Sequence, residues 1–499
     1  MSPPFVLSGT VIYMSMIDVL ELTFAYDGSY ENIFENVSFR MDTDWKLGFT
    51  GRNGRGKTTF LNLLQGKYEY QGSISARADF EYFPYTVTDT QAPAADAVRE
   101  IAPQAQDWEL MRELNLMDFD LEALYRPYMT LSNGERTKLL LAAMFLHENG
   151  FLLIDEPTNH LDMEGRAAVS RYLAQKKGFI LVSHDRAFLD GCVDHILSIN
   201  RTNIEIQKGS FSSWYYNKEL QDGFERAENE KLKGEIVHLT AAARRTAGWS
   251  DAVEKTRTAA GDSGYVGHKS AKMMKRSKAI ETRRETVIEE KSKLLKNIET
   301  ADRLKISPLA YRQPRLISIR EVGVDYGSRT VCSNVTFNVE RGDRVALTGK
   351  NGCGKSSLIK LMLGEDIPHT GHVERGTGLT VSYVPQDTSF LSGDLTEYIR
   401  REAVEESLVK AILRKLDFSR EQFYKDMSSY SAGQKKKVLI AVSLAKQAHL
   451  YIWDEPLNYI DVFSRMQIER LLAEFSPTMV FVEHDKKFVE NAATLTVRL

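Results

Sequence analysis

The stretch GRNGRGKTT at residues 51–59 decides the fold, because it matches the GxxxxGK[ST] pattern of a phosphate-binding glycine loop. A second match, GKNGCGKSS at residues 349–357, begins 298 residues later (349 − 51). Each loop follows a short apolar, β-branched run and precedes a helical pattern, so each predicts a strand, a loop and a helix. A single match can be an ordinary turn, but two matches in register favour two nucleotide sites.

Other short motifs recur in the same order in both halves of the chain. The recurring pairs, 299 or 300 residues apart, are Tyr26 and Tyr326, Gly134 and Gly433 (in LSNGE and YSAGQ), Asp155 and Asp454 (in LLIDEP and YIWDEP), and His184 and His484 (in SHD and EHD). Apolar runs before the aspartates and the histidines predict buried parallel strands. The chain therefore contains a duplicated α/β domain, with ligand chemistry expected at the carboxyl ends of its strands.

The polar residues of these motifs suit the binding and hydrolysis of a nucleoside triphosphate. Lys57 and Lys355 are expected to reach the β- and γ-phosphates within the glycine loops. The residues expected to hold Mg²⁺ are Thr58, Asp155, Ser356 and Asp454. The residues expected to act on the attacking water and the γ-phosphate are Glu156, Glu455, His184 and His484. An acidic pair alone would indicate a solvated turn and a lone histidine a packed side chain, but the repeated spacing favours catalysis.

Length and composition limit the class of protein. The 499 residues are 42% apolar and 27% charged, which predicts two or more folded domains, and the net charge of −3 gives no overall sign of a nucleic-acid or membrane partner. The uncharged run at residues 5–17 is too short to span a bilayer, and no basic residue precedes it as in a secretory signal. Cys192, Cys332 and Cys353 lack metal or disulfide spacing. We expect a cytoplasmic protein.

The segment between the two halves has a helical composition. Residues 217–305 contain no proline and are rich in Ala, Glu, Lys, Leu and Arg, with apolar residues at helical spacing. The pattern breaks at AAGDSGYVG, residues 259–267, which indicates a turn. Two helices of about 40 residues are therefore expected to form an antiparallel hairpin. The plain alternative is a helical spacer.

Charge favours a nucleic-acid contact at the tip of this hairpin, near residues 244–278. The tip carries nine basic and three acidic residues, a local balance of +6 that leaves −9 for the rest of the chain. Basic side chains that meet phosphates release counterions, so this tip is suited to RNA or DNA. Trp249 and Tyr265 either stack on bases or pack the hairpin end. The residues expected to make these contacts are Arg244, Arg245, Trp249, Lys255, Arg257, Tyr265, Lys269, Lys272, Lys275, Arg276 and Lys278.

Taken together, the motifs in each half resemble an ATP-binding-cassette domain, in which LSNGE and YSAGQ are similar to the signature motif. The resemblance implies that Tyr26 and Tyr326 stack on adenine and that Asp162 and Asp461 lie in loops joining two sites. In the two sites that the resemblance implies, Lys57 lies with Ser431 and Gly433, and Lys355 lies with Ser132 and Gly134. The other residues expected to contact ATP are Gly51, Arg52, Asn53, Gly54, Arg55, Gly56, Thr58, Thr59, Gly349, Lys350, Asn351, Gly352, Cys353, Gly354, Ser356 and Ser357.

The two halves depart unequally from this family pattern. Gln386, in YVPQ, fits the family's Mg²⁺-contacting glutamine, but the first half reads YFPY and places Tyr85 there. PTNHLD becomes PLNYID in the second half, and Glu483 replaces the serine before the histidine. Asn133 and Ala432 replace a signature glycine. We therefore expect two working but unequal sites.

Two tandem cassettes joined by a basic helical hairpin resemble the ABC-F proteins. The resemblance implies a monomer that binds the E site of the 70S ribosome and contacts 23S rRNA and P-site tRNA, without a membrane or a transmembrane partner. Hairpin length and the compact first half look like the antibiotic-resistance branch of the Lsa and Vga kind, which displaces lincosamides, pleuromutilins and streptogramin A compounds. The expected domains are an unassigned extension at 1–13, cassettes at 14–215 and 307–499, and the hairpin at 216–306.

Three other functions remain to be weighed. A housekeeping ABC-F translation factor would differ mainly at the hairpin tip. The ATPase subunit of a drug exporter would need a membrane partner and would have no use for a basic hairpin of this length. A DNA-repair ATPase of the coiled-coil type would have one split nucleotide domain instead of two complete ones.

Overall fold

The computed structural model describes residues 16–28, 32–147, 150–200, 203–257, 282–283, 303–327 and 330–499, with the backbone alone for 242–257. The chain divides into two compact units. The first unit combines Met1–Ser212 with Ala301–Leu499, and the second is Ser213–Thr300. Within the first unit, the segments before and after the second unit are called here the first half and the second half.

The first half begins with antiparallel strands and continues as alternating strands and helices. Its strands are β1 (Met16–Phe24), β2 (Phe34–Asp42), β3 (Lys46–Thr50), β4 (Gln71–Ser75), β5 (Asp79–Phe83), β6 (Gly150–Asp155), β7 (Phe179–Val182), β8 (His195–Ile199) and β9 (Ile204–Lys208). Its α-helices are α1 (Lys57–Leu64), α2 (Ala94–Ile101), α3 (Asp107–Asn115), α4 (Asn133–Phe145), α5 (Met163–Ala174) and α6 (Arg186–Cys192). Short 3₁₀ helices lie at Leu121–Tyr125, Tyr128–Thr130 and Pro157–His160.

The second half repeats this order. Its strands are β10 (Arg315–Asp325), β11 (Thr330–Glu340), β12 (Arg344–Thr348), β13 (His369–Arg375), β14 (Val381–Val384), β15 (Leu450–Asp454), β16 (Met479–Val482) and β17 (Leu495–Arg498). Its α-helices are α9 (Lys355–Leu363), α10 (Leu395–Arg401), α11 (Glu406–Lys415), α12 (Ala432–Ala445), α13 (Val462–Phe475) and α14 (Lys486–Ala492). Short 3₁₀ helices lie at Arg420–Tyr424 and Met427–Ser429.

Each half contains a mainly parallel sheet and a smaller antiparallel sheet. The larger sheets have the orders β5-β6-β7-β3-β8-β9 and β14-β15-β16-β12-β17, and the smaller sheets have the orders β2-β1-β4 and β11-β10-β13. Strands β3 and β12, which lead into the glycine loops, pair in parallel with β7 and β16. The glycine loop, the aspartate and the histidine of each half therefore lie at one edge of a sheet, as the strand pattern predicts.

The buried strands explain why the apolar runs are continuous. Strands β7 and β16 are buried along their whole length, because helices cover both faces of a parallel sheet. At the end of the first glycine loop, Gly56 has a φ of 93°, and an added Cβ would lie 2.4 Å from Cγ2 of Ile33. A glycine is therefore required there by both conformation and space. The prediction of an α/β chain with two tandem cassettes is confirmed.

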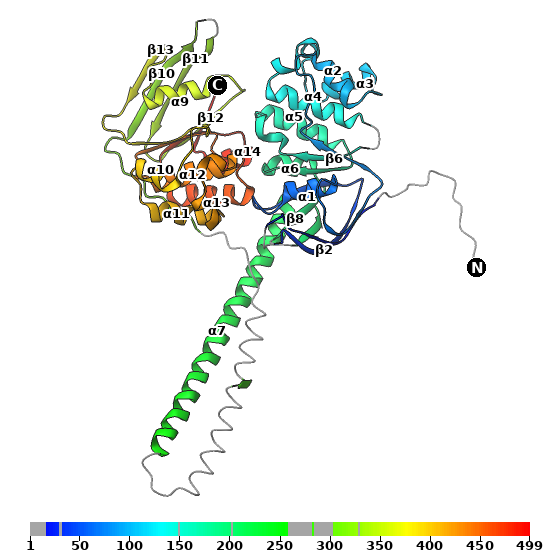
Figure 1. Cartoon of the computed structure of the whole chain (residues 1–499). Coiled ribbons are helices and arrows are strands. Elements are labelled where there is room, and N and C mark those ends of the chain that lie inside the picture. Colours follow the sequence, from blue (N-terminus) through cyan, green and yellow to red (C-terminus); the bar gives the residue numbers. More distant parts are fainter. Residues whose placement is uncertain are drawn as a thin grey trace, which may run out of the picture. The chain divides into compact units, whose positions relative to one another are not determined.

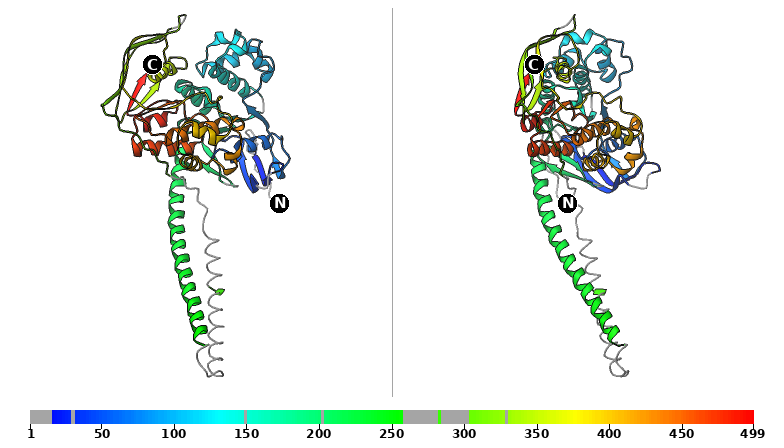
Figure 2. Two further views of the ribbon diagram at one scale, coloured as in Figure 1. Left: turned by 60° about the vertical axis from the view of Figure 1, so that its left-hand side comes forward. Right: turned by 90° about the vertical axis from the view of Figure 1, so that its left-hand side faces the viewer.

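The second unit contains α7, one helix over Phe211–Arg257 of 47 residues. Figures 1 and 2 show it, in green, as an unbroken helix. At 1.5 Å per residue its length is about 70 Å. Its polar composition agrees with the helix expected before the turn at 259–267.

Several predicted segments fall outside the described part of the chain. The N-terminal extension at 1–13 and the turn at 259–267 lie there. The predicted contact residues that lie there are Tyr265, Lys269, Lys272, Lys275, Arg276 and Lys278. Only the helical backbone is described at Arg244, Arg245, Trp249, Lys255 and Arg257. The proposed tip therefore stays a prediction from the sequence.

Candidate active site

The lysine of each glycine loop is held by carbonyl oxygens of its own loop. Lys57 Nζ donates to Gly51 O at 2.7 Å and to Arg52 O at 3.2 Å, and Lys355 Nζ donates to Gly349 O at 2.9 Å. Both lysines are buried, and burial is the main cause that lowers the pKa of Lys57. Each ammonium is therefore held inside its loop, where its positive charge would neutralise part of the negative charge of a bound phosphate chain.

Oxygen ligands suited to Mg²⁺ lie beside each glycine loop. In the first half, Thr58 Oγ1 donates to Asp155 Oδ2 at 3.0 Å, and the hydroxyl of Tyr82 donates to the same oxygen at 2.8 Å. In the second half, burial raises the pKa of Asp454, and a hydrogen bond from Ser356 opposes the shift. Asp454 Oδ1 is buried and has no hydrogen-bond partner among the described residues. Hydroxyl and carboxylate oxygens in this arrangement fit a magnesium ion.

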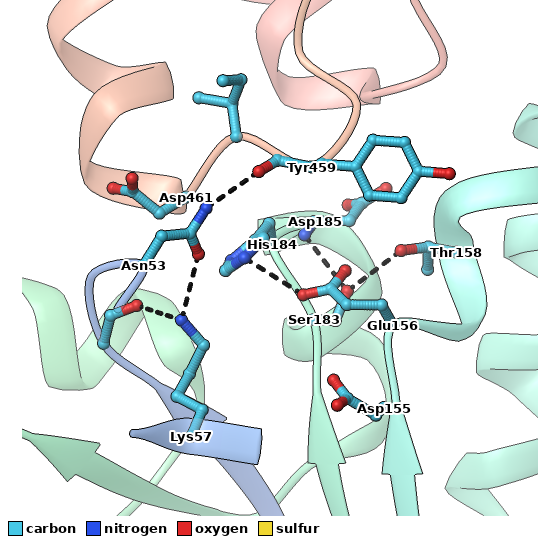
Figure 3. Close-up of polar contacts among 12 residues, drawn as sticks. Asn53, Lys57, Asp155, Glu156, Thr158, Ser183, His184, Asp185, Tyr459 and Asp461 are labelled. Carbon is cyan, nitrogen blue, oxygen red and sulfur yellow. Dashed lines mark hydrogen bonds and ion pairs between the residues drawn. The ribbon is translucent and has the colours of Figure 1, made fainter. Parts of the chain in front are cut away.

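The first glutamate, Glu156, has buried carboxylate oxygens and a strained backbone. Its φ of 53° is left-handed, which is unusual for this residue type and is typical of functional sites. His184 Nε2 lies 3.1 Å from Glu156 Oε1 (Figure 3). Burial, reinforced by the charge of Asp155, raises the pKa of Glu156 to about 8. Burial and the charge of Lys57 lower the pKa of His184.

The second glutamate, Glu455, has the same left-handed backbone, with a φ of 46°, but different partners. Gln386 Nε2 donates to its Oε2 at 2.9 Å, and Asn458 Nδ2 donates to the same oxygen at 2.7 Å. Burial pushes its pKa upward, but His484, Gln386 and Asn458 outweigh this and lower the pKa to about 2. Glu455 is therefore an ionised and oriented carboxylate at neutral pH.

Tyr85 faces away from the first site. Its hydroxyl donates to Glu100 Oε1 at 3.1 Å, and Thr88 donates to the same oxygen. Among the described residues, no amide donates to Glu156 as Gln386 donates to Glu455. This agrees with the expectation that replacing glutamine at this position makes the two sites unequal.

A cavity of about 940 Å³ brings together the two motifs that the sequence assigns to one site. It is lined by Ser132 and Gly134 from the first half and by Lys355, Gln386, Glu455 and His484 from the second. Ser132 caps α4, and Glu135 completes a capping box with it. The N-terminus of α4, with its partial positive charge, thus opens onto the cavity that contains the second glycine loop.

The other pairing is formed by closer contacts. Asn53 Nδ2 donates to the backbone oxygen of Tyr459 at 2.8 Å (Figure 3). Tyr459 has a φ of 64°, a left-handed backbone conformation that is unusual for a non-glycine residue. An added Cβ on Gly433 would lie 2.5 Å from the same oxygen and 3.3 Å from Asn53 Nδ2. The first glycine loop and the second signature helix, whose first turn is capped by Ser431, therefore meet closely.

The aspartates of the joining loops differ between the halves. Asp162 Oδ2 accepts a hydrogen bond of 3.4 Å from the backbone N–H of Asn351, in the opposite glycine loop. Asp461 Oδ2 is instead paired with Lys437 of its own half at 3.0 Å, with both side chains buried. Its charge still acts on Lys57 across the two halves.

The tyrosines expected to stack on adenine lie beside the helices that follow the glycine loops. The hydroxyls of Tyr26 and Thr59 are 2.8 Å apart, and those of Tyr326 and Ser357 are 3.2 Å apart. Both rings are partly exposed, at 43% for Tyr26 and 49% for Tyr326. A base can therefore reach either ring.

Other candidate residues contact the opposite half through their side chains. Arg52 and Arg55 each approach Asp417 Oδ2, at 3.9 and 4.0 Å, and Lys350 Nζ lies 3.4 Å from Glu164 Oε2. The sequence assigned these three residues to the nucleotide through their place in the loop alone. Asp417 carries no motif, so sequence reasoning did not identify it.

Residues 34–159 and 332–458 match the ABC transporter family, which together is just over half of the chain. The ribosome protection protein VmlR of Bacillus subtilis is 26% identical over 491 residues, covering 95% of this chain and 86% of VmlR. The ATP-binding protein Uup of Caulobacter vibrioides is 29% identical over 484 residues, covering 94% and 74%.

The fold is similar to that of a solved archaeal ribosome recycling factor, aABCE1, crystallised with a ribosomal stalk protein. The TM-score is 0.63 at 18% identity, covering 96% of this chain and 87% of that one. Within the described residues, no helix is both long and apolar enough to cross a bilayer. The chain therefore belongs to the ABC transporter family, with two copies of its ATP-binding domain, and is homologous to the ABC-F proteins.

Proposed function

We propose that the protein is an ATPase that binds and hydrolyses ATP at two sites between its halves. The observation that carries this proposal is the cavity in which Ser132 and Gly134 of one half lie with Lys355 of the other. Lys355 and the N–H groups of the glycine loop would hold the phosphate chain. Ser132, at the N-terminus of α4, would meet the γ-phosphate from the opposite side. The bound ATP would thus contact both halves.

Hydrolysis requires a water aligned with the γ-phosphate. Glu455, ionised and held by Gln386 and Asn458, would accept a hydrogen bond from this water and orient its attack. His484, next to Glu455, would contact the γ-phosphate. Thr58 and Asp155 in one site, and Ser356, Asp454 and Gln386 in the other, would hold Mg²⁺, which neutralises charge on the β- and γ-phosphates when bound.

We further propose that ATP-driven closure serves ribosome protection in the cytoplasm. The similarity to VmlR over 95% of the chain supports this proposal. The +6 balance at 244–278 supports RNA as the partner of the helical unit. The proposed action is binding at the E site of the 70S ribosome, with contacts to 23S rRNA and P-site tRNA, and displacement of lincosamide, pleuromutilin and streptogramin A antibiotics.

Expression in a drug-sensitive bacterium tests this function. We expect the minimal inhibitory concentrations of lincomycin and tiamulin to rise, because both drugs act at the peptidyl-transferase centre, while that of erythromycin stays unchanged. Chloramphenicol is the fourth drug compared in the same experiment. A Lys57→Ala/Lys355→Ala variant, which lacks the two ammonium groups expected to hold the phosphate chains, serves as the control for expression of an inactive protein. No shift for any drug would favour a housekeeping translation factor, and reduced drug accumulation would favour an exporter subunit.

The two sites are expected to turn over ATP at different rates. Glu455 is oriented by two amides, whereas Glu156 receives no such hydrogen bond and Tyr85 points to Glu100. Glu455→Gln should therefore lower steady-state ATPase activity more than Glu156→Gln does. Phosphate release by the two single variants, measured at saturating ATP, checks this. Equal losses would contradict the asymmetry.

A further inference from the structure

Two buried charged residues of the second half have no charged counterpart in the first half. At an offset of 299 residues, Lys436 on α12 corresponds to Thr137 on α4. At an offset of 300 residues, Glu483 after β16 corresponds to Ser183 after β7. Lys436 and Glu483 are each only 2% exposed. Burying a charge is costly unless it is paired, so the two replacements call for a common explanation.

The ammonium of Lys436 connects two segments of the second site. Its Nζ donates to the backbone oxygen of Pro385 at 2.9 Å and to that of Asp454 at 3.4 Å. Pro385 directly precedes Gln386, and Asp454 directly precedes Glu455. Gln386 and Glu455 are themselves hydrogen-bonded at 2.9 Å. Lys436 therefore links the backbone beside Gln386 to the backbone beside Glu455.

Glu483 is held by backbone groups of the same site. Burial raises its pKa, and the charge of Arg465 is the first of those that oppose this rise. Glu483 Oε1 also accepts the N–H of Leu457 at 2.8 Å, and its Oε2 accepts the N–H of His484 at 3.2 Å. Glu483 thus reaches the loop after Glu455 and the backbone of the neighbouring histidine.

In the first half, the two corresponding positions carry uncharged side chains. Thr137 donates to the backbone oxygen of Asn133 within its own helix, at 3.0 Å. Ser183 Oγ lies 3.2 Å from Thr158 Oγ1 (Figure 3). Neither contact reaches the segment that carries Tyr85. The lysine is therefore present only in the half where an amide, that of Gln386, contacts the glutamate of the site, Glu455.

We propose that Lys436 is a positioning residue of the second ATPase site, which ties the loop of Gln386 to the end of β15 and so holds Gln386 against Glu455. This inference rests on the ATPase activity proposed above. It assigns to the signature helix of the second half a role in its own half's site, in addition to its contact with the opposite glycine loop.

Substitutions that restore the first-half residues test this role. In the Glu156→Gln background, which isolates the second site, we expect Lys436→Thr to lower kcat about ten- to a hundredfold, as is typical when a residue that orients a ligand is lost. KM for MgATP should stay within about twofold, because the glycine loop is untouched. Lys435→Thr removes a charge from the neighbouring, more exposed position and should leave kcat unchanged.

A double-mutant cycle separates positioning from simple stability. Lys436→Thr should have little further effect on kcat once Gln386→Ala is present, because both changes remove the same restraint. Lys436→Thr/Glu483→Ser restores both first-half residues, and kcat should stay low even where the melting temperature is that of the parent.

Three results would overturn the inference. They are a double variant whose kcat returns to that of the parent, losses from Lys436→Thr and Gln386→Ala that multiply independently, and a raised KM at unchanged kcat. All measurements are made without ribosomes. ATP turnover by the Glu156→Gln parent reports the proposed ATPase activity by itself, so a failure there is distinguishable from a failure of Lys436.

Discussion

Exchanging Glu156 and Glu455 together for glutamine is expected to lower ATP turnover by about a hundredfold or more and to hold the protein on 70S ribosomes. Glutamine keeps the size of each side chain but cannot accept a proton, and loss of a general base typically has an effect of this order. In the proposed function, ribosome binding requires ATP between the halves, whereas release requires hydrolysis. Co-sedimentation with ribosomes in the presence of ATP should therefore increase.

The matched control is Glu122→Gln/Glu474→Gln, which removes two exposed carboxylates, one from each half. It should sediment and hydrolyse ATP like the wild type. If the Glu156→Gln/Glu455→Gln variant pelleted with 70S particles no better than the wild type in ATP, release by hydrolysis would be the wrong model. The ATPase assignment would then rest on phosphate release alone.

Shortening residues 259–267 is expected to abolish antibiotic protection while ATPase activity survives. The physical reason is that the +6 tip carries both charge for phosphates and aromatic side chains for bases, whereas the halves contain the nucleotide chemistry. Trp249→Ala with Tyr265→Ala should have the same effect. Minimal inhibitory concentrations and phosphate release from the same variants are the measurements.

Charge reversal of the tip separates binding from protection. Lys272→Glu, Lys275→Glu and Arg276→Glu together should weaken ribosome binding most at low salt and make it less dependent on salt, because these side chains are expected to meet backbone phosphates. If protection persisted after the tip was shortened, with the protein still bound to ribosomes, the helical unit would be a plain spacer.

Most of the nucleotide sites could be predicted from the sequence because their chemistry depends on short local patterns. Glycine loops, a carboxylate pair after an apolar run and a serine at a helix start each determine their own backbone. The duplication then fixed which elements correspond. The structure places Lys355 with Ser132 and Gly134 in one cavity, and it places Asn53 beside Gly433.

Contacts that depend on packing could not be predicted in the same way. Lys436 stands in a run of three lysines, which reads as a solvated face, yet its ammonium is buried against two carbonyl oxygens. Asp417 has no motif, and it approaches Arg52 only because the chain folds back on itself. The replacement of Ser183 by Glu483 was visible as a departure, but its contacts with the N–H groups of Leu457 and His484 became evident only in three dimensions.

Each site takes residues from both halves, and this has a consequence for the evolution of the gene. Ser132 serves the glycine loop that contains Lys355, and the backbone of Tyr459 meets Asn53 of the other loop. Because each proposed site draws residues from both copies, we expect selection to act on the two copies together and not on either one alone. We expect a harmful change near Ser132 to be compensated around residue 350 and not around residue 52. The two copies within this gene are bound to diverge as interlocked partners.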